Sequence, residues 1–287
     1  MASVLVVEEV ERGKALARFT ELPHALSGGD ERFAPMVMAW ERYRLDSRRN
    51  PYFETGEAAC FLARRMGQPV GRIAAHLAEP GGPGRFGFWW VDDDAHVAAA
   101  LVEAAQTWLA AQGCASMEGP WSFTTEDEGG VQAAGHEVRG LTGRPWHPPH
   151  VARLLEDAGL VAQEDRPTWR LPATESGPEL PPSDDLPGQA GSYADARLVL
   201  QGIAAVPDVA GALRTSGLRS AWSLAKRARA RDWGTCTVVR CSADAAVAVP
   251  ALQAAAGSAG YTSVIAPWSP DPSAAPEAVH RTYRLSW

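Results

Sequence analysis

The sequence predicts a mixed α/β protein with two domains, the second shorter than the first, and three observations support this class. The chain has 287 residues, more than the about 100–200 that one domain usually holds. Apolar residues follow strand-like alternation in some segments and helical spacing in others. A 38-residue segment of the first half also recurs without gaps in the second half.

In the first half, apolar patterns and turn residues predict the order of the elements. We expect strands at residues 59–65, 70–77, 86–91 and 115–121, a turn at 66–69, and helices at 95–112 and 151–158. Within 95–112, apolar residues recur at spacings of three and four positions. Asp94 is placed to cap the start of this helix and Gly113 its end.

A linker separates the two predicted domains. Residues 172–193 contain five prolines and three glycines with little apolar periodicity, which is typical of a linker. We therefore place a first domain at 1–172, the linker at 173–193 and a shortened second domain at 194–287.

The internal repeat predicts the elements of the second domain. Residues 85–122 match residues 232–269 at a constant offset of 147, with 12 identities in 38 positions, including Gly113 with Gly260 and a shared Pro-Trp-Ser. A duplicated strand–helix–strand unit follows from this match. In the second copy we expect a strand at 235–241, a helix at 245–259, a strand at 262–266 and a closing strand at 280–287.

Composition and net charge indicate which class of protein this is and which partners are disfavoured. Hydrophobic residues make up 46% and charged residues 21% of the chain, as in globular proteins that bury a core. The net charge of −7 disfavours nucleic acid and anionic membranes, because binding to them depends on neutralising phosphates. The sequence has no apolar run long enough to span a membrane and no signal-peptide pattern. We expect a cytoplasmic protein that acts on a small molecule.

The sequence predicts no metal site. It contains four cysteines, Cys60, Cys114, Cys236 and Cys241. They lack the paired spacing of zinc ligands and are expected as free thiols in a reducing compartment. His147 and His150 flank two prolines, whose extended backbone separates the two imidazoles by about 9 Å, too far for a single zinc ion.

Several segments resemble a known family. They are NPYFETGE (50–57), FLARR (61–65), GQPVGRIAAH (67–76), FGF (86–88) and GPWSF (119–123). Together they resemble a largely uncharacterised group of bacterial proteins similar to GCN5-related N-acetyltransferases (GNATs), with two such domains in tandem. The resemblance covers residues 1–170 and is weaker in the second domain. It implies a GNAT-type mixed sheet in each half and transfer of an acyl group from an acyl-CoA to an amine.

The expected cofactor loop is absent from both copies. The family holds the CoA pyrophosphate with a loop of the type Gln/Arg-x-x-Gly-x-Gly/Ala before the central helix. Residues 91–96 instead contain Asp92, Asp93 and Asp94, and residues 240–245 contain an acidic cap without glycine. Carboxylates at a helix start stabilise the helix but repel a pyrophosphate. The sequence therefore disfavours acetyl-CoA or another acyl-CoA as a ligand.

The loop after the first Pro-Trp-Ser carries the candidate catalytic acids. Glu126, Asp127 and Glu128 directly follow a strand end, where a GNAT-like sheet opens a cleft. Carboxylates there can hold a substrate ammonium or take its proton. The alternative is a solvated acidic turn. In the second copy the same place has one acid, so the first domain is the expected site.

Aromatic and histidine residues complete the candidate site. His147 is the fourth catalytic candidate, as a base or as a hydrogen-bond donor. The candidate substrate contacts are Trp90, Trp121, Phe123, Thr125 and Trp146. Tryptophans in such positions can form a wall for a cationic ligand, and core packing is the alternative.

Three functions remain open from the sequence. The first is N-acyl transfer to a small amine-bearing metabolite, which the family resemblance implies. The second is a repurposed GNAT fold that works without CoA, binding a small ligand or catalysing another reaction. The third is a non-catalytic interaction protein.

Overall fold

The computed structural model describes residues 4–11, 13–27, 29–33, 38–123, 129–141, 144–179, 198–200, 203–207, 235–241 and 245–287. Its first half contains β1 (Leu5–Glu9), α1 (Gly13–Ser27), α2 (Met38–Arg44), the 3-10 helix η1 (Pro51–Glu54), β2 (Glu57–Arg65), β3 (Gln68–Leu77), β4 (Gly84–Val91), α3 (Ala95–Ala111), β5 (Ser116–Gly119), β6 (Val131–Ala134), α4 (Pro149–Asp157) and β7 (Val161–Pro172). Its second half contains β8 (Leu198–Leu200), β9 (Ile203–Pro207), β10 (Thr235–Cys241), α7 (Ala245–Ser258), β11 (Ser263–Ala266) and β12 (Ala278–Ser286).

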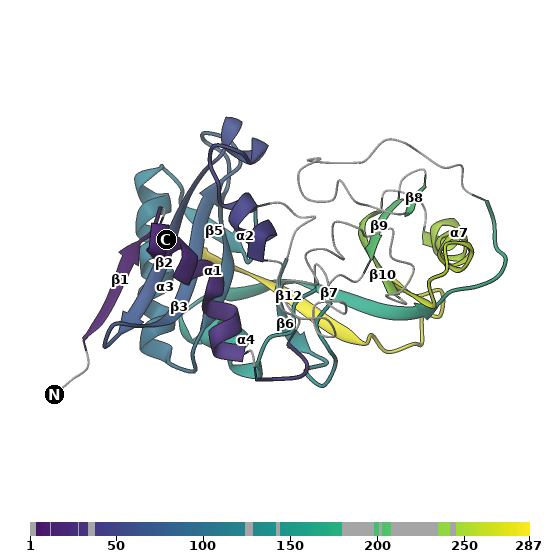
Figure 1. The fold of residues 1–287 in the computed structure, drawn as a ribbon. Helices are drawn as coiled ribbons and strands as arrows, with labels where there is room; N and C mark the ends of the chain where they lie inside the picture. Colours follow the sequence, from purple (N-terminus) through teal and green to yellow (C-terminus); the bar gives the residue numbers. More distant parts are fainter. Residues whose placement is uncertain are drawn as a thin grey trace.

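The described strands form one sheet that runs through both halves. Its order is β1-β2-β3-β4-β5-β12-β7-β11-β10-β9-β8, and β6 pairs with β12. The pairs β4–β5 and β10–β11 are parallel, whereas the other described pairs are antiparallel. The long strands β7 and β12 lie side by side and extend from one half into the other (Figure 1).

Helices cover both faces of the N-terminal part of the sheet. Along β2, Phe61 and Ala63 join the core cluster that also contains side chains of α3 and α4. The alternate residues Cys60 and Leu62 join a second cluster with Phe19 of α1. This alternation follows from the two-residue period of a strand, and it produces two cores on opposite sides of the sheet.

The predicted elements of the first half are present, with small changes at their ends. The expected four-residue turn at 66–69 is tighter, because Met66 and Gly67 both take positive φ angles, 50° and 78°, as in the two-residue turns that match strand twist. The expected strand at 115–121 ends at Gly119, before Pro120. The sequence patterns did not predict five further elements of this half, which are β1, α1, α2, β6 and β7.

The duplicated strand–helix–strand unit is confirmed. Helix α7 lies between the adjacent parallel strands β10 and β11, as α3 does between β4 and β5. The pairing register differs between the copies. Glu118 pairs with Arg85, whereas its repeat equivalent Ile265 pairs with Thr237, five positions beyond the repeat equivalent of Arg85. The helix and the second strand therefore keep the repeat offset, and the first strand has slipped.

The closing strand β12 lies at the expected position but joins the N-terminal sheet. On one side its C-terminal part pairs with β5, for example Leu285 with Met117, and residues 279–281 pair with β6. On the other side β7 pairs with it from Ala278 to Arg284. The division at 1–172 and 194–287 stays a prediction. Residues 173–179 of the expected linker are described and pack on α7, where the Thr174 N–H donates to the Gln253 carbonyl at 3.1 Å; residues 180–193 lie outside the described part.

Within the described part of the chain, no helix is both long and apolar enough to span a bilayer.

Candidate functional site

The start of α3, where the fold family would hold a pyrophosphate, is occupied by the protein's own carboxylates. Asp94 Oδ1 accepts hydrogen bonds from the backbone N–H groups of His96 at 3.0 Å and Val97 at 3.3 Å. Its other oxygen forms an ion pair with Arg65, and the neighbouring Asp93 pairs with Arg153. Two donors of the first turn are thus already satisfied, and the added negative charge disfavours a second anion. Residues 242–244, at the start of α7, lie outside the described part.

The parallel ladder between β4 and β5 is short, and the chain that leaves β5 stays close to β4. Gly84 and Arg85 pair with Met117 and Glu118, and beyond them the Trp121 N–H donates to the Phe86 carbonyl at 2.6 Å. A Cβ at Gly87 would overlap the Trp121 carbonyl, so glycine permits this backbone contact. The next residue, Phe88, has a φ of 52°, and the β3–β4 ladder shifts its register there, between the pairs Ala74–Gly87 and Arg72–Trp90.

Two predicted contact residues, Trp121 and Phe123, follow the end of β5 and are buried, with exposed fractions of 5% and 2%. The Phe123 ring stacks on Tyr52, with centroids 4.5 Å apart and an angle of 22° between the ring planes. Phe88 and His76 meet the same ring edge-on. Phe123 therefore belongs to a packed aromatic cluster on the α1 side of the sheet.

The acidic loop begins directly after Phe123. Glu126, Asp127, Glu128 and Thr125 lie outside the described residues. The ends of the loop are described: Trp121 and Gly129 form an antiparallel bridge, and the Gly130 N–H donates to the Pro120 carbonyl at 2.8 Å.

The guanidinium of Arg166, on β7, covers the base of this loop. Its Cζ lies 4.7 Å from the centre of the Trp121 ring. A side chain at Gly129 would overlap both the Trp121 ring and Arg166. Burial lowers the pKa of Arg166, but a guanidinium remains a cation at neutral pH. A positive charge therefore lies at the base of a loop with three carboxylates.

His147 lies in a second cluster with Trp90 and Trp146. Its ring centre is 5.0 Å from that of Trp90, and Phe33 links the two tryptophans in one apolar group. The Trp146 indole N–H donates to the His136 carbonyl at 2.8 Å. All three predicted residues are buried, at 3–4% exposure, so packing is the role that these contacts show.

The hydrogen bonds of His147 define its protonation. The backbone N–H of Gln132 donates to the ring nitrogen Nδ1 of His147 at 3.3 Å, and the backbone N–H of His147 donates to Gln132 Oε1 at 3.1 Å. Burial, with a smaller effect of His280, lowers the pKa of His147 well below its ordinary value. The ring is therefore neutral with its proton on Nε2, which favours the donor alternative over the base.

His280, on β12, connects the two clusters and was not predicted. Its ring centre is 6.4 Å from that of His147, and a Cβ on Gly130 would lie 3.1 Å from the His280 Cβ. Its Nε2–H donates to the Pro145 carbonyl at 3.0 Å, and burial lowers its pKa to about 3. Nδ1 has no hydrogen-bond partner among the described residues and is buried at a small pocket between β6, β7 and β12.

The structure thus separates the predicted aromatic wall into two groups. Trp121 contacts Arg166 and Gly129, whereas Trp146 belongs to one cluster with Phe33 and Trp90, and the acidic loop begins and ends at the first group. Arg166 and His280 lie in no sequence motif, so the sequence offered no signal for them. Within the described ranges, no three His, Cys, Asp or Glu side chains gather as metal ligands would.

Comparisons with known proteins place the chain among acyltransferase-like folds. No family model matches it. It is 28% identical over 183 residues to a bacterial ceramide synthase of Caulobacter vibrioides, covering 61% of this chain and 48% of that protein. It is 30% identical over 170 residues to the protein YghO of Escherichia coli, covering 56% of this chain and 42% of that protein. The matches therefore span about half the length of these relatives.

A solved structure resembles nearly the whole chain. It is a tandem GNAT protein from the clavulanic acid biosynthesis pathway, with a TM-score of 0.50 and 12% sequence identity, covering 99% of this chain and 98% of that one. Identity at this level speaks for the fold alone. With its two strand–helix–strand units in one continuous sheet, the chain has a tandem GNAT-like fold.

Proposed function

We propose that this protein transfers an activated acyl group to the amine of a small molecule, and that the reaction takes place beside the end of the β4–β5 ladder. The observation that carries this proposal is the acidic sequence Glu126–Glu128, whose flanking residues Trp121 and Gly129 form a bridge beside the Arg166 guanidinium. The tandem GNAT-like fold supports it. The ceramide synthase relative also supports it, because a ceramide is an amide of a fatty acid with a long-chain amino alcohol.

In the proposed mechanism, a carboxylate of Glu126, Asp127 or Glu128 takes a proton from the substrate ammonium. The free amine then attacks the acyl carbon, a C–N bond forms, and the bond between the acyl carbon and its leaving group breaks. The nitrogen loses its second proton in this step, and the leaving group departs with a proton. Arg166 keeps the neighbouring carboxylates ionised, because an adjacent cation favours the charged form. In this mechanism His147 is not the base; its neutral ring can only donate a hydrogen bond through Nε2–H.

The start of α3 does not fit the pyrophosphate of CoA, so we assign no step to that group. Two first-turn N–H donors already bind Asp94, and Asp92 and Asp93 add negative charge. The same observation favours a second candidate function, a GNAT fold that binds a small amine without acyl transfer.

Amide formation by the purified protein, followed by mass spectrometry, tests the proposal. The donors are acetyl-CoA, palmitoyl-CoA and the matching N-acetylcysteamine thioesters, which lack the pyrophosphate; the acceptors include a short diamine and a long-chain amino alcohol. We expect an amide product, with catalytic efficiencies for the CoA and N-acetylcysteamine donors within about tenfold of each other, because pyrophosphate binding adds little here. Amine binding without any product would favour the second candidate. If the protein shows neither amine binding nor product, the remaining function is that of a non-catalytic interaction protein.

A further inference from the structure

A buried chain of hydrogen bonds runs from Tyr52 to the backbone of Trp121. The Tyr52 hydroxyl lies 2.9 Å from His76 Nδ1, and His76 Nε2 lies 2.8 Å from the Trp121 carbonyl oxygen. The exposed fractions of Tyr52 and His76 are 2% and 0%. Tyr52 precedes β2 and His76 is on β3, so two separate parts of the chain converge on the turn that leaves β5.

Chemistry sets the direction of each hydrogen bond. A carbonyl oxygen only accepts, so His76 carries its proton on Nε2 and donates to Trp121. Burial lowers the pKa of His76 to about 4, which leaves Nδ1 with a lone pair at neutral pH. Burial also raises the pKa of Tyr52, so its hydroxyl keeps its proton and donates to Nδ1. Every polar atom in the chain from Tyr52 to Trp121 then has a partner.

The peptide units on both sides of Trp121 are held in this way. The N–H of Trp121 donates to Phe86 of β4, and its carbonyl accepts from His76 of β3. Two residues later, Phe123 takes a φ of 82°, an unfavourable value for a residue with a side chain, and its ring stacks on Tyr52. Tyr52 thus supports the turn twice, through its hydroxyl and through its ring.

We propose that Tyr52 and His76 are positioning residues that hold the backbone of residues 121–123 against β4, directly beyond the β4–β5 ladder. Through this backbone they set where the acidic loop starts relative to Arg166 and Gly129. They act through Trp121 and not by touching substrate. Their effect on turnover rests on the proposed acyl transfer, whereas the backbone anchoring is measurable without any substrate.

Matched hydroxyl deletions in the full-length protein test this inference. Tyr52→Phe removes the hydroxyl and keeps the ring on Phe123. The control, Tyr283→Phe, removes the hydroxyl of another buried tyrosine, which donates to Glu156 of α4 at 3.1 Å in the core cluster on the opposite face of the sheet. Hydrogen–deuterium exchange is measured on the peptides that cover residues 117–131, and kcat and KM are measured with the best donor and acceptor.

For Tyr52→Phe we expect exchange in these peptides to rise about tenfold and kcat to fall about tenfold, with little change in the donor KM. Tyr283→Phe leaves both unchanged. His76→Gln, which can keep an N–H donor near Trp121, retains more turnover than His76→Leu.

The outcomes separate this inference from the proposed function. Exchange in Tyr52→Phe equal to that of the unmodified protein overturns the anchoring, whatever the assay shows. Faster exchange with an unchanged kcat overturns the positioning role. Faster exchange in a protein that forms no amide with any donor supports the anchoring and contradicts acyl transfer.

Discussion

Three buried imidazoles, those of His76, His147 and His280, are neutral in the folded protein. Burial lowers the pKa of His76 to about 4 and that of His280 to about 3, and it lowers the pKa of His147 in the same direction. In the unfolded chain these groups titrate near their ordinary value of about 6.5. Between these values the unfolded state binds more protons, so stability rises with pH.

The free energy of unfolding should therefore fall as pH decreases from 7 to 5, by up to about 1.4 kcal/mol per pH unit for each histidine. Urea denaturation at several pH values measures this slope. His280→Gln should reduce the slope, whereas His96→Gln, at an exposed position on α3, should leave it unchanged. A stability that is constant from pH 7 to 5 would contradict the buried neutral state.

Asp94 should stabilise α3 and exclude acetyl-CoA. Replacing it with alanine removes an N-cap and should lower stability by about 1 kcal/mol. Asp93→Ala, a change at a 59% exposed side chain, should cost less than about 0.5 kcal/mol.

In calorimetric titrations, the unmodified protein should bind acetyl-CoA weakly or not at all. Micromolar affinity would show that this helix start accepts a pyrophosphate despite its carboxylates.

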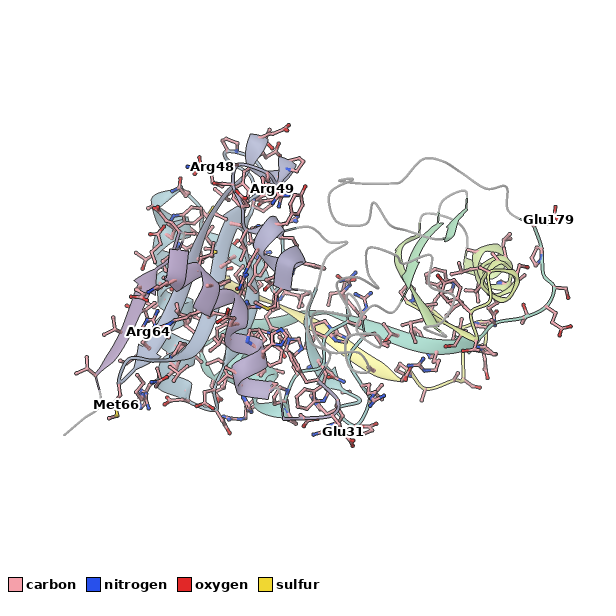
Figure 2. All side chains as sticks on the ribbon, viewed as in Figure 1. Glu31, Arg48, Arg49, Arg64, Met66 and Glu179 are labelled. Atoms are coloured by element: carbon pink, nitrogen blue, oxygen red, sulfur yellow. The ribbon has the colours of Figure 1, made fainter. Side chains whose placement is uncertain are left out.

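The acidic loop should matter for turnover and little for stability. Glu126→Gln and Asp127→Asn remove one charge each from a loop, where substitutions usually change stability by about 0.5 kcal/mol or less. If one of them is the base, its loss should lower kcat by about 10²–10⁴-fold. The control is Glu179→Gln, an exposed residue beyond the end of β7, which Figure 2 labels on the opposite side of the view from Met66. Equal turnover in all three variants would make the loop a solvated turn.

At the scale of elements, a buried ion cluster attaches α2 to the sheet. Glu41 of α2 pairs with Arg72 of β3 at 2.8 Å and with Arg44 at 2.6 Å, and Glu41 and Arg72 are fully buried. Arg72 also donates to the Phe19 carbonyl of α1 at 2.8 Å. Burial alone would raise the pKa of Glu41, but the charges of Arg72 and Arg44 outweigh it and hold the pKa below its ordinary value.

Neutralising Glu41 should therefore destabilise the protein strongly. Glu41→Gln leaves the Arg72 cation buried without its counter-charge, which typically costs about 3–5 kcal/mol. Glu21→Gln breaks the Arg42–Glu21 pair, whose side chains are 53% and 56% exposed, and should cost less than about 1 kcal/mol. Chemical denaturation of both variants measures the difference. Similar losses would mean that the buried cluster adds no more than a surface pair.

At the scale of the whole molecule, the C-terminal strand completes the N-terminal sheet. Strand β12 lies between β5 and β7, so without it neither strand keeps its hydrogen bonds on that side (Figure 1). It also carries Tyr283, a fully buried member of the largest N-terminal core cluster. The first half is thus built from two distant parts of the sequence.

A fragment of residues 1–172 should therefore fail to unfold cooperatively. Adding a peptide of residues 273–287 should restore a cooperative transition, because the peptide supplies β12. The control peptide carries Tyr283→Asp, which would place a charge in the apolar core. Circular dichroism during thermal unfolding reports the result. A cooperative transition of the fragment alone would instead support an independent first domain.

The secondary-structure elements that were predicted correctly are those with a clear apolar pattern or cap in their own sequence. The helix at 95–112 and the strands at 59–65 and 70–77 depend on apolar spacing and caps within a few residues, and all three formed. Strand β7 had no such signal, because its first five residues are exposed and include charged side chains. Its strand state comes from the ladders with β12 and β11.

The sequence by itself determined the strands at 59–65 and 70–77, the helix at 95–112, the duplicated strand–helix–strand unit and the missing phosphate loop, because each depends on residues that are neighbours in the chain. Only the tertiary structure decided that β12 enters the N-terminal sheet, that Arg166 covers Trp121, and that Tyr52, His76 and Trp121 form one chain of hydrogen bonds. Such contacts join residues 24 to 170 positions apart, as in Tyr52 with His76 and Ser286 with Ser116. No local pattern encodes them, because burial and pairing across a sheet depend on how the whole chain packs.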